Sequence, residues 1–204
     1  SNKIKVNLIR IESDKLKPSQ ISKKLKNVSG LLIPGGFGKR GTEGKISAIK
    51  YARERKIPFL GICFGMQMAI IEFARNKLKI KKAGSTEFDK KCYPVIGLIE
   101  EWNKEGKIIK GTDKDLGGTM RLGLYEAKLR NNSAIKNIYK SNSINERHRH
   151  RYEVNNNLKS QFEGKGLMFS GMSPDNKLPE IIELKNHPWF IGVQFHPEFK
   201  SRPL

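Results

Sequence analysis

The sequence has few cysteines and no long apolar segment. Only Cys63 and Cys92 occur among its 204 residues, without a CxxC pair, so we expect neither a disulfide framework nor a zinc-binding cysteine cluster. No apolar run approaches the roughly 18 residues of a membrane-spanning helix, and residues 1–20 lack the apolar core of a signal peptide. These absences favour a soluble protein of a reducing, cytoplasmic compartment, with no membrane partner.

Acidic residues are also scarce, because 40 lysines and arginines stand against 20 aspartates and glutamates, a net charge of +20. Such a charge attracts anions, including nucleotides and nucleic acids. The excess is mostly lysine scattered between predicted elements without interleaved aromatic residues, which is typical of a solvated surface. We therefore expect no nucleic-acid partner. The length, with 37% hydrophobic and 29% charged residues, predicts one folded domain.

Two strand–helix units follow each other in the first third of the chain. Residues 30–34 and 57–63 are short apolar runs typical of buried parallel strands. Helical patterns follow them at 45–55 and 65–76. Such units predict a parallel sheet with right-handed crossovers and a ligand site at the carboxyl ends of its strands.

The remaining elements are shorter. Residues 3–11 alternate polar and apolar side chains, as a half-buried strand does, and 18–25 form a short helical pattern. A further helix is expected at 133–139. Further strands are expected at 94–100, 119–129, 147–154, 166–172, 180–184 and 189–196.

A candidate nucleophile stands where the second buried strand meets its helix. Cys63 lies between Gly61 and Gly65, and small flanking residues permit the sharp turn of a nucleophile elbow. The amide of Phe64 and the helix N-terminus would face the same point, lowering the thiol pKa and stabilising an oxyanion. The alternative interpretation is that Cys63 is a small buried hydrophobic residue.

A glycine-rich loop at residues 35–38 follows the first buried strand and offers further backbone amides. Gly36, Gly38 and Gly41 also satisfy the G-x-G-x-x-G pattern of dinucleotide-binding proteins. That fold requires an acidic residue at the end of the next strand, where this chain has Cys63. We therefore do not expect a dinucleotide, and no P-loop motif occurs.

His196 and Glu198 are the candidates for a base and its orienting carboxylate. They lie two residues apart after a strand pattern, so an extended backbone would project both to one face. The alternative is an ordinary histidine at a strand end. Residues 147–151 (RHRHR) are open to three interpretations: a nucleic-acid patch, a metal site, or a strand facing an anionic ligand. A metal is disfavoured because His148 and His150 form an incomplete ligand set.

Six ordered blocks resemble the glutaminase domains of the CTP synthase family, which are class I glutamine amidotransferases. These are residues 34–38, 61–67, 85–88, 117–123, 147–155 and 187–199. The resemblance implies an α/β, flavodoxin-like fold with a mostly parallel central sheet flanked by helices and an additional antiparallel β portion. It also implies one amidotransferase domain over residues 1–204, trimmed at both ends, with the synthase domain outside this chain.

The resemblance also implies a role for each matching residue. Cys63 would be the nucleophile, His196 the general base and acid, and Glu198 its partner, with the amides of Gly36 and Phe64 as the oxyanion hole. Glutamine and its oxyanion would be bound by Gly36, Phe64, Gly65, Met66, Gln67, Glu87 and Arg151. Among these residues, Arg151 would pair its guanidinium group with the α-carboxylate of glutamine. Phe37 and residues 147–149 would lie near the opening that faces the synthase domain.

The activity implied is hydrolysis of L-glutamine through a γ-glutamyl thioester. The ammonia would pass to the synthase domain, which converts UTP to CTP with ATP and magnesium and is stimulated by GTP; no cofactor or metal would bind this chain. The full-length enzyme would be a homotetramer. Two alternatives stay open: another class I amidotransferase, such as the glutaminase of GMP synthetase or a γ-glutamyl hydrolase, and a non-enzymatic nucleic-acid-binding or regulatory module. The blocks at 117–123 and 147–155 favour the CTP synthase family.

Overall fold

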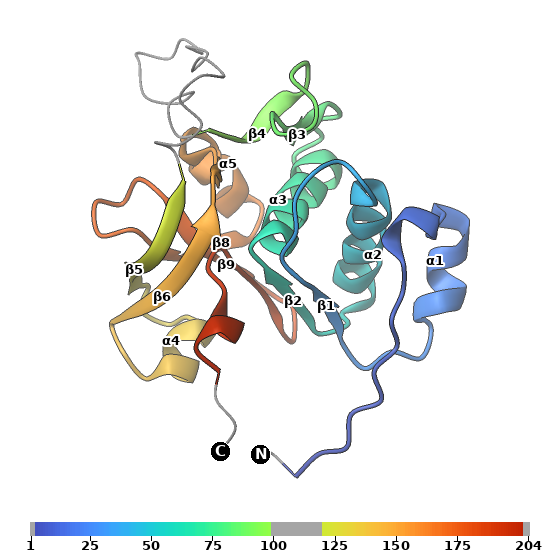
Figure 1. Cartoon of the computed structure of the whole chain (residues 1–204), viewed down its shortest axis with the longest axis horizontal. Helices are drawn as coiled ribbons and strands as arrows, with labels where there is room; N and C mark the ends of the chain where they lie inside the picture. Colours follow the sequence, from blue (N-terminus) through green and yellow to red (C-terminus); the bar gives the residue numbers. More distant parts are fainter. Residues whose placement is uncertain (1–2, 99–119, 202–204) are drawn as a thin grey trace.

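The computed structural model of the chain describes residues 3–98 and 120–201. A seven-stranded sheet forms its centre (Figure 1). The strand order is β1-β2-β10-β9-β8-β5-β6. In this order the strands are Leu31–Ile33, Phe59–Ile62, Phe190–Val193, Pro179–Leu184, Leu167–Met172, Arg121–Leu129 and Ser143–His150. A second sheet, β3-β4-β7, comprises Ala83–Ser85, Tyr93–Leu98 and Tyr152–Val154.

The described part of the chain contains five α-helices and three short 3-10 turns. The helices are α1 Pro18–Leu25, α2 Thr42–Arg55, α3 Phe64–Asn76, α4 Ala134–Tyr139 and α5 Lys159–Gly164. The 3-10 turns are Ser13–Lys15, Asn156–Leu158 and Pro197–Phe199. Local chemistry sets several helix starts: α1 begins with Pro18 in its first turn, where a missing N–H costs nothing. The Ser133 side chain caps α4 by accepting the Lys136 N–H.

The large sheet is mixed. β1, β2 and β10 pair in parallel, whereas the pairings from β10 through β9, β8 and β5 to β6 are antiparallel. This confirms the predicted α/β class with an antiparallel portion. In the described residues of this sheet, parallel pairing is confined to β1, β2 and β10, so the parallel part is smaller than the resemblance implies.

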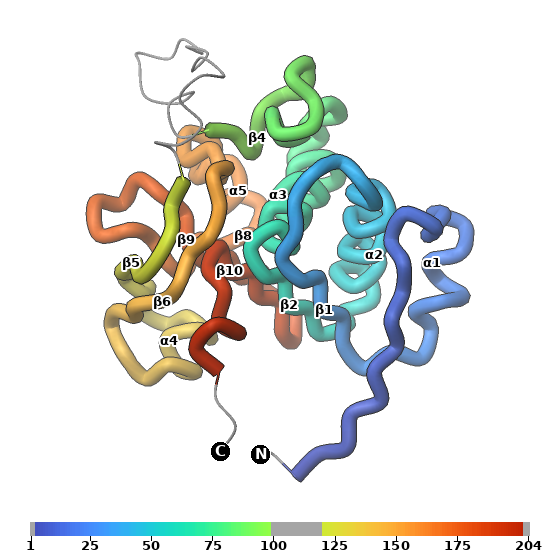
Figure 2. Tube along the Cα trace, in the orientation of Figure 1, coloured from blue at the N-terminus to red at the C-terminus, as the bar shows by residue number. Residues whose placement is uncertain are grey.

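Apolar side chains fill both faces of the sheet. Phe59 of β2 belongs to the larger core, which packs against α2, α3 and α5, whereas Leu60 and Ile62 face a smaller core beneath α4. α1 packs outside α2, as Figure 2 also shows. The apolar run predicted as a buried strand therefore matches the burial of β2 on both of its faces.

α3 is the central helix, and each of its residues from Phe64 to Ala74 is buried. Its one buried carboxylate, Glu72, receives two hydrogen bonds from Arg53 of α2, at 2.8 and 2.7 Å. A paired guanidinium offsets the desolvation of that carboxylate. Packing on all sides holds the N-terminal turn of α3 in place, and this turn carries Phe64.

The predicted strand at residues 3–11 is wrong. These residues have no regular secondary structure and pair with none of the described strands. The side chains of Ile4, Val6, Leu8 and Ile9 are between 63% and 76% exposed. An alternating pattern makes a strand possible, but a strand forms only where a neighbour supplies hydrogen bonds and a covering face.

Two other predictions need adjustment. The strand predicted at 147–154 divides at Arg151 into β6 and β7, which lie in different sheets. Residues 99–100 of the strand predicted at 94–100 and residues 117–119 of the block at 117–123 lie outside the described residues. The other predicted helices and strands are present, with small shifts of their ends.

Candidate active site

Cys63 lies on a strained turn between β2 and α3. Its backbone has φ 48° and ψ −101°, which non-glycine residues rarely adopt. A Cβ atom on Gly61 would lie 2.7 Å from the carbonyl carbon of Gly65 and 2.8 Å from the amide nitrogen of Met66. One on Gly65 would collide with the carbonyl oxygen of Ile33 in β1. Both glycines are therefore required by the close approach of α3 to the strands, as the predicted elbow demands.

The Cys63 thiol is buried, and burial raises its pKa to about 12. A hydrogen bond from the Phe64 amide lowers the thiol pKa, but by less than burial raises it. The carboxylates of Glu153 and Glu198 raise the pKa further, and a hydrogen bond from the Gln194 side chain lowers it slightly. The prediction of a lowered thiol pKa is therefore wrong, because desolvation outweighs the helix N-terminus. The thiol needs a base to remove its proton.

His196 and Glu198 form the predicted pair. The Nδ1 atom of His196 lies 2.7 Å from Oε1 of Glu198. A carboxylate only accepts hydrogen bonds, so Nδ1 carries the proton and Nε2 remains available as a base. The ring stacks on Phe199, with centroids 4.6 Å apart. A Cβ atom on Gly35 would lie 2.7 Å from Cε1 of His196, so the ring sits directly against the backbone of the glycine-rich loop.

The sheet brings the nucleophile and the base to one edge. β2 and β10 are parallel neighbours, with Ile62 opposite Val193, and the Cys63 amide donates to the Val193 carbonyl at 2.7 Å. Cys63 is the first residue after β2 and His196 the third after β10. Both therefore lie at the carboxyl ends of adjacent parallel strands, where the sequence predicted a ligand site.

Glu87 reaches the glycine-rich loop from beyond β3. Its Oε1 accepts a hydrogen bond from the Gly38 amide at 2.6 Å, and burial raises the pKa of this carboxyl. Gly38 has φ 75°, a conformation that favours glycine. Gly36 packs against the ring of Phe64, whereas Phe37 is 89% exposed. The loop, Glu87 and the start of α3 thus line one side of the site.

The other predicted glutamine-binding residues lie at the start of α3 and after β6. Met66 is buried in the larger core, so only its backbone can face a ligand. The Gln67 amide donates to the Tyr152 carbonyl at 2.9 Å and to Oε1 of Gln194 at 3.3 Å. Arg151 is half-buried beside Tyr152, which places it near the N-terminal turn of α3.

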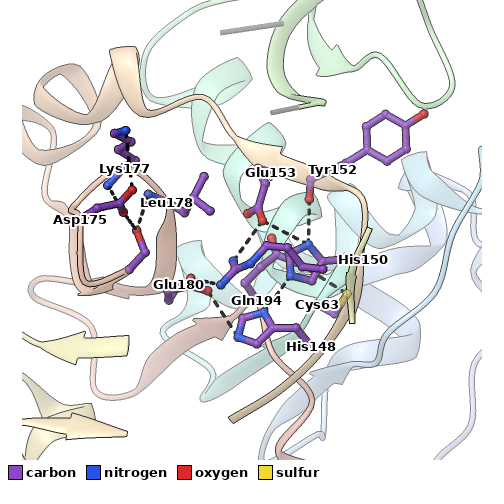
Figure 3. Close-up of polar contacts among 12 residues, drawn as sticks. Cys63, His148, His150, Tyr152, Glu153, Asp175, Lys177, Leu178, Glu180 and Gln194 are labelled. Carbon is purple, nitrogen blue, oxygen red and sulfur yellow. Dashed lines mark hydrogen bonds and ion pairs between the residues drawn. The ribbon is translucent and has the colours of Figure 1, made fainter. Parts of the chain in front are cut away.

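A buried charge cluster behind Cys63 escaped sequence reasoning (Figure 3). Arg121 of β5 contacts Glu153 at 3.1 Å and Glu180 at 2.8 Å. Desolvation raises the pKa of Glu153 to about 8; Arg121 opposes this rise, and the nearby carboxylate of Glu180 adds to it. His148 and His150 join the cluster, with their rings 2.8 Å apart between Nδ1 and Nε2.

The alternation of the RHRHR block was the available signal for this cluster. On β6, Arg147 and Arg149 are exposed, while His148 and His150 are buried. Burial lowers the pKa of His148 to about 3 and that of His150 well below its ordinary value. Both imidazoles are therefore neutral at physiological pH. The structure favours the strand interpretation of this block, with the arginines pointing outward.

No helix in the described parts of the chain is long and apolar enough to cross a membrane.

Comparison with known proteins identifies the family. The sequence model of the family "Glutamine amidotransferase class-I" matches residues 1–204. The chain is 77% identical over 203 residues to CTP synthase of Pelagibacter ubique, and 57% identical over 205 residues to that of Rhizobium meliloti. All of this chain is aligned in both comparisons, but it spans only 38% of each relative.

Solved structures agree with this result. The glutaminase domain of Trypanosoma brucei CTPS with bound acivicin superimposes with a TM-score of 0.86 and 33% identity, over 98% of this chain and 76% of that one. A glutamine amidotransferase from Methylobacillus flagellatus has a TM-score of 0.52 at 12% identity, over 84% of this chain and 53% of that one, and shares the fold alone. The chain therefore belongs to the class I glutamine amidotransferases, and its sequence places it with the glutaminase domains of CTP synthases.

Proposed function

We propose that this chain hydrolyses L-glutamine to glutamate and ammonia as the single amidotransferase domain of a CTP synthase. The observation that carries the proposal is the arrangement of Cys63 and the His196–Glu198 pair at the carboxyl ends of two adjacent parallel strands. The Trypanosoma relative supports it, since acivicin is a glutamine analogue.

The chemistry assigns one role to each member of the triad. Nε2 of His196 removes the proton from the Cys63 thiol as the sulfur attacks the side-chain amide carbon of glutamine. Glu198 fixes the imidazole and stabilises its charged form. His196 then gives the proton to the departing ammonia, leaving a γ-glutamyl thioester. A water molecule activated by His196 attacks the thioester, releasing glutamate and regenerating the thiol.

Backbone amides would stabilise the oxyanion of both tetrahedral intermediates. The Phe64 N–H already points at the sulfur, and the Gly36 N–H belongs to the loop under His196. Donors fixed in position before the reaction are the most effective form of this stabilisation. Rigid packing around α3 supplies that fixation on the Phe64 side.

The ends of glutamine would be held by charged groups. Glu87 would bind the α-ammonium group and Arg151 the α-carboxylate, for which a guanidinium is well shaped. Gln67 and the backbone of Gly65 and Met66 would complete the pocket. The hydrogen bond between Glu87 and Gly38 would couple substrate binding to the glycine-rich loop.

The whole protein would use the ammonia in a synthase domain of the same polypeptide. That domain would aminate UTP to CTP with ATP and Mg²⁺, with GTP activating glutamine hydrolysis, so the whole enzyme would be a cytoplasmic ligase of pyrimidine biosynthesis. We propose a homotetramer for it. The exposed side chains of Phe37, Arg147 and Arg149 would lie toward the synthase domain.

Acivicin labelling followed by mass spectrometry tests the proposal. We expect one adduct on Cys63 that excess glutamine prevents, retained in Cys92→Ser and lost in Cys63→Ser. Cys92 is the matched control because it is the other thiol of the chain. Glutamate release should be lost in Cys63→Ser only. A folded full-length enzyme that shows neither labelling nor glutamate release in the presence of GTP would contradict the proposed function.

A further inference from the structure

The side chain of Gln194 is fully buried against the Cys63 sulfur. Its Nε2 atom lies 3.6 Å from Sγ of Cys63 (Figure 3), and its own backbone amide donates to the Glu180 carbonyl at 2.8 Å. Gln194 is the residue after β10, so the strand that leads to His196 also holds this amide. The mechanism described above gives Gln194 no role.

The hydrogen bonds of the cluster determine which end of the Gln194 amide faces the sulfur. A backbone carbonyl only accepts, so the Gln67 atom that lies 2.9 Å from the Tyr152 carbonyl must be its NH₂ group. The same NH₂ group lies 3.3 Å from Gln194, so the Gln194 atom there must be its oxygen. The NH₂ group of Gln194 therefore points at Cys63, and the orientation is anchored on the main chain.

We propose that Gln194 is a catalytic residue that donates a hydrogen bond to the Cys63 thiolate, and that Gln67 is the positioning residue that keeps its NH₂ group turned toward the sulfur. This inference rests on the proposed function. The Gln194 amide is a second hydrogen-bond donor to the sulfur, supplied by the residue after β10, whereas the first donor is the Phe64 amide at the start of α3.

The second donor matters because the Phe64 amide has two tasks. It hydrogen-bonds the sulfur at rest, but it has to turn to the substrate oxygen once the tetrahedral intermediate forms. Among the described residues, the Cys63 sulfur is the hydrogen-bond partner of the Gln194 NH₂ group, and Gln67 holds the oxygen of the same amide. Gln194 can therefore stabilise the sulfur both before attack and when the thiolate departs.

The local charges increase the need for such a donor. Burial disfavours a negative sulfur most strongly, and the charge of Glu198 adds to this effect, as does that of Glu153 when it is ionised. A hydrogen bond to an ionised group is stronger than one between neutral groups, especially where water is excluded. The Gln194 amide brings this stabilisation without a further buried charge.

Alkylation of Cys63 by iodoacetamide tests the proposal without using glutamine. The variants are Gln194→Met and Gln67→Met, with Gln161→Met on the exposed surface of α5 as the matched control, all in a Cys92→Ser background. Rates are measured by mass spectrometry between pH 7 and 10. We expect Gln194→Met to react about tenfold more slowly at each pH below the thiol pKa, a rise of about one pKa unit. The alkylation rate of Gln67→Met should lie between those of Gln194→Met and the control.

The sign of the change separates a lost hydrogen bond from loosened packing. Burial raises the pKa of Cys63, so a disturbed core would expose the thiol and speed its alkylation. Unchanged or faster alkylation in a folded Gln194→Met protein would overturn the proposal. If that variant does not fold, Gln67→Met decides the question by the same criterion.

Glutamate release by the full-length enzyme provides the second readout. We expect the kcat of Gln194→Met to fall about tenfold while its KM for glutamine changes by less than about twofold, because the donor acts on the sulfur rather than on bound substrate. If the full-length parent enzyme, with Gln194 intact, is alkylated at Cys63 but never hydrolyses glutamine, the proposed function is refuted. A parent that hydrolyses glutamine alongside an unaltered Gln194→Met would refute only the role of Gln194.

Discussion

The contact between Gly61 and the first turn of α3 gives a prediction about stability. In Gly61→Ala, the new methyl carbon would lie 2.7 and 2.8 Å from the carbonyl carbon and oxygen of Gly65, and 2.8 Å from the Met66 nitrogen. Carbon atoms pack at about 3.5–4.0 Å, so the helix start would have to retreat by about 0.8 Å. These are backbone atoms, which cannot rotate away, and α3 is buried along its length.

Overpacking of this kind costs about 1–3 kcal/mol, and a backbone clash belongs at the upper end. Since alanine loses less backbone freedom than glycine on folding, about 0.5–1 kcal/mol is regained. We therefore expect the free energy of unfolding to fall by about 2 kcal/mol and the melting temperature by about 4–8 °C for a domain of this size.

Thermal and urea unfolding of the two proteins measure this loss. Gly30→Ala is the matched control, because a methyl group there would lie 3.6 Å from the Pro58 carbonyl oxygen, an ordinary contact. Gly30→Ala should leave the melting temperature unchanged or slightly higher. If Gly61→Ala melts with the wild type, the close approach of β2 and α3 is not the reason for the glycine.

Three further predictions concern the site and its surroundings. Glu198→Gln should lower the kcat for glutamine by about a hundredfold or more while stability changes little, because it removes the charge that stabilises the His196 imidazolium; an unchanged rate of glutamate release would contradict this role. Glu87→Gln keeps an oxygen for the Gly38 amide but loses the negative charge, so we expect the KM for glutamine to rise about tenfold with a nearly unchanged kcat in steady-state assays. His148→Gln should change the pH dependence of stability: burial lowers the folded-state pKa of this imidazole to about 3 from an ordinary 6.5, so the unfolded wild type takes up an extra proton below pH 6.5 and stability is lost as pH falls. His148→Gln lacks this loss, so between pH 7.5 and pH 5 its free energy of unfolding should rise by about 2 kcal/mol relative to that of the wild type. If urea unfolding gives the same difference between the two proteins at both pH values, the lowered pKa of His148 is refuted.

Features set by local sequence were predictable. The elbow around Cys63 follows from the two glycines that flank it, and the structure confirms why each is needed. The predicted helix at 18–25 matches α1 from end to end. Pro18 indicates where the helix begins, and the spacing of the apolar residues within these eight positions indicates a helix. The pairing of His196 with Glu198 also follows from a two-residue separation.

Features that depend on distant segments were not predictable. Residues 3–11 have the pattern of a strand, but none of the described strands pairs with them. The sequence of residues 147–155 does not indicate that the chain leaves one sheet for the other at Arg151. The orientation of the Gln194 amide depends on hydrogen bonds that involve Gln67 and the Tyr152 carbonyl, which lie 127 and 42 positions away from Gln194 in the sequence.

The raised pKa of Cys63 has a consequence for how the site works. At neutral pH a thiol with a pKa of about 12 is almost fully protonated, and the protonated form resists oxidation and alkylation. Attack on glutamine therefore requires transfer of the proton to His196 as the substrate arrives, and the negative charge on the sulfur is short-lived. Fixed donors are most useful under these conditions, because they stabilise that charge at the moment it forms and need no reorganisation. A buried neutral thiol, a histidine held by Glu198 and amides fixed by α3 and β10 together give a nucleophile that is protected at rest and activated by its substrate.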